Sequence, residues 1–141
     1  MSSRRWWRCL RSAVNGAGLM RLNGANRLTV FGEVGLSCQL ELPDQSRLDG
    51  PGTLRLLGGQ TLNGRIASRV VLAGGASFAM ASGLVEAGGV VEIESGASVI
   101  SNPNISYEVQ GQFRNAGQLR FYSRDVNTGL FGTGSFVNSG V

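Results

Sequence analysis

The chain has 141 residues, 42% of them apolar, with 22 glycines, 3 prolines and no histidine. By length it fits one domain. The apolar content argues against disorder, and the lack of a three-residue glycine period excludes collagen. Without histidine, catalytic dyads and triads built on that residue and the usual zinc patterns are excluded as well.

The net charge of +4 comes from the N-terminus. Four arginines lie in the first eleven residues, where no acid occurs, whereas from residue 12 onward nine arginines balance nine acids. A basic stripe that tracks nucleic acid is therefore not expected along the body of the chain.

Residues 1–13 differ in kind from the rest. Trp6, Trp7 and Leu10 form one apolar stripe at helical spacing, with arginines around it. Three interpretations stay open for this segment: a cap on the end of a solenoid, a segment that adheres to anionic lipid or nucleic acid, and a frayed basic tail. The candidate lipid or nucleic-acid contacts are Arg4, Arg5, Trp6, Trp7 and Arg8.

Few features bear on location. Cys9 and Cys38, the only cysteines, fit one disulfide or two free thiols. No stretch reaches the roughly 18 apolar residues of a membrane helix, and residues 1–13 lack the apolar region of a Sec signal peptide.

From residue 14 onward the pattern indicates short strands separated by glycine turns. Residues 15–24 match residues 49–58 at a spacing of 34, each with an Asn/Asp-Gly-x-Gly turn, a short strand with arginine at one fixed place, and a second glycine turn. Alternating apolar residues predict further strands with one buried face. These strands are 27–34, 37–42, 69–72, 77–80, 98–100 and 105–109.

One phrase occurs twice near the end of the chain. Residues 111–117 read GQFRNAG, and 23 residues later 134–140 read GSFVNSG. We expect equivalent positions to stack on successive coils, with phenylalanines inward, asparagines in αL turns and the glycines beside them at positive φ. The predicted ladder is Phe113, Asn115 and Gly117 under Phe136, Asn138 and Gly140.

The predicted fold is therefore all-β: a single-stranded right-handed parallel β-helix of about five or six irregular coils over residues 14–141, ending within a repeat. The alternative is a β-sandwich or jelly roll. An open C-terminal edge would pair with further coils or with another copy of the chain.

Candidate sites are few, and no catalytic, cofactor or metal residue is assigned. Arg21, Arg55 and Arg120 recur at one place in the repeat, so they predict either a row that grips sulfated or uronic-acid glycans or long side chains that cover apolar surface. Glu92 and Glu94 share a strand face, which suits a carbohydrate-cleaving site or a solvated outer face.

The stretch GQFRNAGQL, residues 111–119, matches a G-x-F-x-N-x-G-x-L unit throughout. Residues 110–141, and more loosely 52–101, resemble the degenerate repeats of large bacterial surface β-solenoid proteins, such as haemagglutinin-like and autotransporter-type adhesins. The resemblance implies a non-catalytic structural or adhesive role at the cell surface or outside the cell, with glycans or a host surface as partners.

Two alternatives come from other classes of protein. One is a carbohydrate-binding or polysaccharide-degrading β-helix module. The other is a viral or phage structural protein that contacts nucleic acid through residues 1–13.

Overall fold

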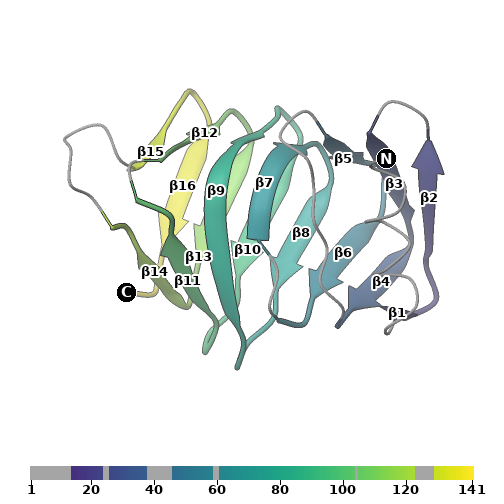
Figure 1. The fold of residues 1–141 in the computed structure, drawn as a ribbon, viewed down its shortest axis with the longest axis horizontal. Helices are drawn as coiled ribbons and strands as arrows, with labels where there is room; N and C mark the ends of the chain where they lie inside the picture. The colour runs from purple at the N-terminus through teal and green to yellow at the C-terminus, as the bar shows by residue number, and fades with distance from the viewer. Residues whose placement is uncertain (1–13, 24–25, 38–45, 59–60, 104, 123–128) are drawn as a thin grey trace.

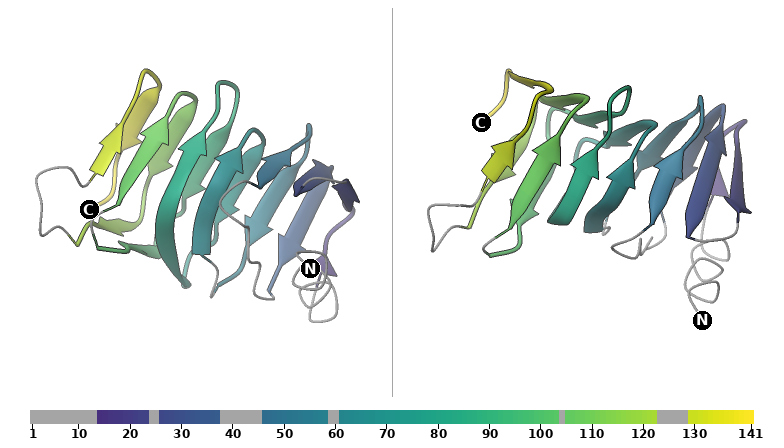
Figure 2. Two further views of the ribbon diagram at one scale, coloured as in Figure 1. Left: turned by 45° about the horizontal axis from the view of Figure 1, so that its top comes forward. Right: turned by 90° about the horizontal axis from the view of Figure 1, so that it is seen from above.

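The computed structural model describes residues 14–23, 26–37, 46–58, 61–103, 105–122 and 129–141. In these ranges the chain is all-β, without a helix, and its strands stack as a β-solenoid of about five turns (Figure 1). The predicted solenoid is confirmed over the sandwich. Figure 2 shows the coils side by side along the long axis, from the purple N-terminal strands to the yellow C-terminal ones.

Two sheets wrap one core. The seven-stranded sheet has the order β1 (Val14–Asn15), β4 (Glu33–Leu36), β6 (Thr53–Leu56), β8 (Arg69–Leu72), β10 (Val90–Ile93), β13 (Gln112–Asn115) and β16 (Ser135–Asn138). The nine-stranded sheet has the order β14 (Gln118–Arg120), β11 (Ser98–Ser101), β9 (Ser77–Val85), β7 (Thr61–Ile66), β5 (Arg47–Asp49), β3 (Arg27–Phe31) and β2 (Leu19–Asn23), with β12 (Ser106–Val109) and β15 (Gly129–Phe131) beside that path.

In the seven-stranded sheet, residues at the same register position stack from coil to coil; we call each such stack a rung. From β4 to β16 its strands pair in parallel without a register shift, and alternate residues point inward. One inward rung runs through Val34, Leu54, Val70, Val91, Phe113 and Phe136, so successive coils take 20, 16, 21, 22 and 23 residues. The 23-residue spacing seen in the sequence is therefore one coil.

The nine-stranded sheet divides along the chain. The long strand β9 pairs with β11 through its first half and with β12 through its second half. Gly83 lies in the second half, where a Cβ would come within 2.6 Å of the Tyr107 ring. The buried tyrosine thus occupies the space that the missing side chain leaves.

The N-terminal end departs from the expected repeat. β1 pairs antiparallel with β4, and β2 pairs antiparallel with β3, so these two strands close both sheets. The proposed match between residues 15–24 and 49–58 is wrong, because the first segment contributes β1 and β2 whereas the second supplies β6 of a parallel coil. Alternating residues between glycine turns suit an antiparallel edge strand as well as a coil.

The other predicted strands lie close to the observed ones. β8 has the predicted bounds, and β9 continues beyond residue 80 to Val85. The predicted strand 27–34 is divided by Gly32, whose φ of 67° turns the chain from one sheet to the other. Most of 37–42 falls outside the described residues.

Candidate functional site

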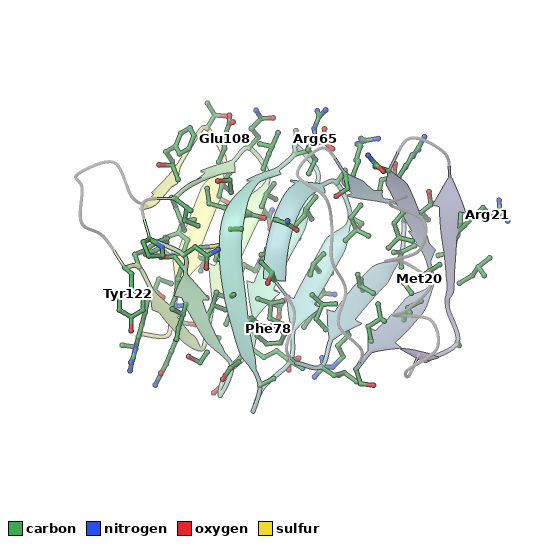
Figure 3. The ribbon with its side chains drawn as sticks, in the orientation of Figure 1. Met20, Arg21, Arg65, Phe78, Glu108 and Tyr122 are labelled. Atoms are coloured by element: carbon green, nitrogen blue, oxygen red, sulfur yellow. The ribbon has the colours of Figure 1, made fainter. Side chains whose placement is uncertain are left out.

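The three arginines predicted to form one row do not lie together. Arg55 is in β6 of the seven-stranded sheet, whereas Arg21 and Arg120 are in β2 and β14, at opposite ends of the nine-stranded sheet. The prediction is wrong because the 34-residue spacing behind it is not a coil period. Arg21, at the far N-terminal edge in Figure 3, has its guanidinium carbon 5.7 Å from the centre of the Phe31 ring.

Arg55 instead makes a bidentate ion pair with Glu94. Its Nη2 donates to Oε2 of Glu94 at 2.7 Å, and the main-chain N–H of Gly74 donates to the same oxygen at 2.9 Å. These hydrogen bonds lower the pKa of Glu94, the larger effect coming from Arg55, and the bond to Glu94 raises the pKa of Arg55. The pair bridges β8, where the outward-facing Val71 is only 4% exposed. This placement fits an arginine that covers apolar surface.

A different set of arginines does form a row. Arg27, Arg47 and Arg65 occupy one register position on β3, β5 and β7; we call them the arginine row. Arg65 is labelled at the upper edge of Figure 3. Each is followed by Leu or Ile, at spacings of 20 and 18 residues. This repeated Arg-aliphatic step was the signal in the sequence that could have found them.

Two carboxylates interleave with the arginine row. Asp49, which is buried, accepts from Arg27 Nε, from Arg47 Nη1 at 3.0 Å and from the Thr29 hydroxyl at 2.9 Å. Glu86 accepts from Arg47 Nε at 2.7 Å and from Arg65 Nη2 at 2.8 Å. The bond to Glu86 is the main reason that the pKa of Arg47 is raised. The row is thus a chain of alternating charges that ties coils together.

The carboxylates considered for glycan cleavage each have their own arginine. Glu92 accepts from Arg69 Nη2 at 2.9 Å, and Glu94 is held by Arg55. Arg120 lies on β14 of the other sheet. Within the described ranges, no group of three or more His, Cys, Asp or Glu side chains is placed to hold a metal ion.

The repeated phrase forms a polar ladder on the last two coils. β13 and β16 set Phe113 against Phe136, with ring centres 5.9 Å apart, and Asn115 against Asn138. Asn115 Nδ2 donates to Asn138 Oδ1 at 2.8 Å, and Asn115 Oδ1 accepts from the Gly117 N–H at 3.1 Å. These amides therefore bond along the stack as well as within their own turn.

The expected backbone geometry of this turn is wrong in one respect. Neither the two asparagines nor Gly117 and Gly140 has a positive φ. The glycines are needed for close approach, since a Cβ on Gly140 would lie 2.1 Å from the carbonyl oxygen of Gly117.

A shallow groove follows the corner before the last three strands of the seven-stranded sheet. Its floor is Gly89, Gly111 and Gly134, where a Cβ would lie 2.3 Å from a carbonyl oxygen of the preceding coil. The groove has a volume of about 410 Å³, and its polar side chains are those of Gln110, Gln112, Thr133 and Ser135. No charged residue lines it. Such a surface offers neutral hydrogen-bonding side chains around three glycines, of which Gly89 and Gly111 are buried.

The remaining predicted features fall outside the described residues. They are the candidate contacts Arg4, Arg5, Trp6, Trp7 and Arg8, together with Cys9 and Cys38. In the part of the chain that is described, no helix is long and apolar enough to cross a membrane.

Comparisons of the chain with protein-family models, with curated proteins and with solved structures gave no significant match.

Proposed function

We propose that this chain is a non-catalytic structural or adhesive β-solenoid segment of a bacterial cell-surface or secreted protein. The observation that carries the proposal is the uninterrupted register from β4 to β16, which stacks the coils into a rod. A rod of this kind holds its outer faces at fixed spacing, which suits display of a surface away from an anchor. The G-x-F-x-N-x-G-x-L unit at 111–119 points the same way.

The ion pairs support a mechanical role for the outer faces. Arg55–Glu94 and Arg47–Glu86 both join residues 39 apart in the sequence, so each crosses an intervening strand. Partly exposed pairs of this kind contribute only about 0–1 kcal/mol each, and the buried apolar residues supply most of the stability. The two pairs that skip a coil nevertheless link coils that are not adjacent, in addition to the contacts between neighbouring coils.

Surface exposure on intact cells tests the proposal. An epitope inserted between Ala87 and Gly88 would sit in an exposed turn, where a Cβ on Gly88 meets nothing within 4 Å. On cells that make the protein, we expect antibody labelling without permeabilisation and loss of the epitope after external protease, while a cytoplasmic control protein stays intact. Labelling only after permeabilisation would contradict a surface location. Because the proposal also covers a secreted protein, the culture medium is assayed for the same epitope.

A second candidate, a carbohydrate-binding module, is favoured by the uncharged groove over Gly89, Gly111 and Gly134. Its polar groups suit a neutral polysaccharide better than an anionic one, because no arginine lines it. Replacing Gln110 and Gln112 together by alanine should weaken binding to neutral polysaccharides at least about tenfold. Gln118→Ala, on the exposed face of β14, is the matched control. Affinity electrophoresis measures the binding. If no neutral polysaccharide in the gel slows the migration of the unmodified chain, this candidate fails.

A further inference from the structure

The arginine row lies on the outer surface of the nine-stranded sheet, on strands well inside the sequence. The residue that follows each arginine is buried in the core; these residues are Leu28, Leu48 and Ile66. Because alternate residues of a strand point to opposite faces, the arginines project outward, as Arg65 does at the upper edge of Figure 3. Uncharged residues hold the same register position on either side of the row, Asn23 on β2 and Leu84 on β9.

The two carboxylates of the row lie beneath its guanidinium groups. The side chains of Asp49 and Glu86 are 7% and 15% exposed, whereas those of the three arginines are 41% to 53% exposed. Each guanidinium carries five N–H groups, and Arg27 and Arg65 each donate one of them to a carboxylate. The row therefore turns its positive groups to solvent and leaves most of the donors of its two outer arginines for a ligand.

The carboxylates also hold the arginines in place. Arg47 donates to Asp49 at 3.0 Å and to Glu86 at 2.7 Å, and each of these carboxylates binds a second arginine on its other side. A long side chain loses rotamer entropy when a ligand fixes it. Here the ion pairs fix the guanidinium groups before a ligand arrives, so less entropy is lost on binding. The row is a pre-organised array of hydrogen-bond donors.

We propose that the arginine row binds a linear anionic polysaccharide, whose sulfate or carboxylate groups accept paired hydrogen bonds from successive arginines. Neighbouring strands of a sheet lie about 4.8 Å apart, which is similar to the rise per sugar in an extended glycan. The polymer therefore runs along the solenoid axis, across β3, β5 and β7, with about one sugar to each coil. Arg27 and Arg65 are its main anchors, because Arg47 is engaged by both carboxylates.

The mixed charge of the row favours a glycan over a nucleic acid. Three arginines against two carboxylates leave one net positive charge, whereas proteins bind duplex DNA by neutralising many phosphates. The DNA backbone also offers only acceptors, which the carboxylate of Glu86 repels. A sugar carries hydroxyl groups beside its anionic groups, so its hydroxyls can donate to Glu86 while its sulfate or carboxylate accepts from the arginines.

Surface plasmon resonance on immobilised polymers tests the proposal with the full chain. The probes are dextran sulfate, polygalacturonate, neutral dextran and duplex DNA, so the first two distinguish a sulfated from a uronic ligand. The basic N-terminal segment could bind anions by itself, so the measurements are made in a background in which its four arginines are replaced by serine; these are Arg4, Arg5, Arg8 and Arg11. We expect this background chain to bind at least one anionic polysaccharide, and neither neutral dextran nor DNA.

Removing the two outer arginines should abolish most of this binding. In Arg27→Gln with Arg65→Gln, Arg47 still donates to both Asp49 and Glu86, so neither carboxylate is left without an arginine. The Kd for the anionic polysaccharide should rise at least about tenfold. The matched control, Arg114→Gln with Arg120→Gln, removes two exposed arginines on β13 and β14 and should leave the Kd unchanged.

A lysine variant separates charge from hydrogen-bond geometry. Arg27→Lys with Arg65→Lys keeps both charges but not the paired hydrogen bonds, so its Kd should lie between those of the background chain and the glutamine variant. Circular dichroism establishes that each variant is folded.

Four results would overturn the proposal: no binding to either anionic polysaccharide, equal losses in the two glutamine variants, DNA bound as tightly as the polysaccharide, or a lysine variant that binds as tightly as the background chain. None of them depends on whether the protein reaches the cell surface, or on the neutral groove over Gly89, Gly111 and Gly134.

Discussion

The side-chain amide of Asn115 donates a 2.8 Å hydrogen bond to Oδ1 of Asn138, one coil further along the solenoid. In the four preceding coils the same register position holds an aliphatic residue: Leu36, Leu56, Leu72 and Ile93. The change from apolar to amide rungs marks the last two coils. It also buries the side-chain amide of Asn115, so the stability of the last two coils depends on the hydrogen bonds of this amide.

Asn115→Ala should therefore lower the free energy of unfolding by about 1–3 kcal/mol, because the Gly117 N–H loses its acceptor in a buried turn. Urea denaturation followed by circular dichroism measures this change. Asn102→Ala, at an exposed position after β11, should cost less than about 0.5 kcal/mol. Equal effects of the two substitutions would show that the amide ladder does not stabilise the fold.

Gly111→Ala should destabilise the fold by about 1–3 kcal/mol, since its Cβ would lie 2.3 Å from the Gly89 carbonyl oxygen and 2.4 Å from that of Glu86. Thermal unfolding of the unmodified chain and of the Gly111→Ala variant measures this loss of stability. Gly88→Asn is the control: this turn residue has a φ of 87°, which asparagine tolerates, and open space around it. A stable Gly111→Ala variant would mean that the coils separate more easily than their packing implies.

The Arg55–Glu94 pair should show a coupling of about 0.3–1 kcal/mol in a double-mutant cycle with Arg55→Met and Glu94→Gln. The coupling should shrink as salt is added, because both side chains are partly exposed. Chemical denaturation at low and high ionic strength measures it. A coupling that does not respond to salt would argue against an electrostatic origin.

The same pair predicts a pH dependence. The pKa of Glu94 is lowered in the folded chain from its ordinary value of 4.5, so the unfolded chain binds the proton more readily. The stabilisation is present above pH 4.5 and is lost as the pH falls through the lower folded value. Between pH 5 and pH 3, the wild type should lose more stability than Glu94→Gln. Parallel losses would exclude this carboxylate as a contributor.

Tyr107→Phe should be neutral or stabilising by up to about 1 kcal/mol. The hydroxyl of Tyr107 is buried and has no hydrogen-bond partner among the described residues, and burial raises the pKa of its phenol. Differential scanning calorimetry would detect the gain. Destabilisation by more than 1 kcal/mol would indicate that the hydroxyl has a partner, such as a bound water.

The regular parts of the fold could be read from the sequence because the stacking repeats residue types. Phe113 and Phe136, with the asparagines two positions later, lie in neighbouring coils of nearly equal length, so their spacing is the coil length. Earlier coils vary between 16 and 22 residues, which hides the period. The arginine row crosses these irregular coils, and its members share only the step to Leu or Ile.

Strand direction was not predictable in the same way. The alternation in Leu19–Asn23 is the same whether the strand runs parallel or antiparallel to its neighbour. Ion pairs such as Arg47–Glu86 depend on which strands end up adjacent, because the two residues lie 39 apart in the sequence. These features follow from tertiary stacking and not from local pattern.

The division of the nine-stranded sheet at β9 has a consequence for how this architecture changes length. From β4 to β16, the parallel strands of the seven-stranded sheet are each four residues long. In the nine-stranded sheet, by contrast, an early coil contributes the single strand β7, whereas a later coil contributes two separate strands, β11 and β12. The strand length of the seven-stranded sheet is thus constant, and the additional residues of longer coils lie in the nine-stranded sheet. A lineage of such chains could lengthen its coils, and reshape one face, without shifting the register that holds the core together.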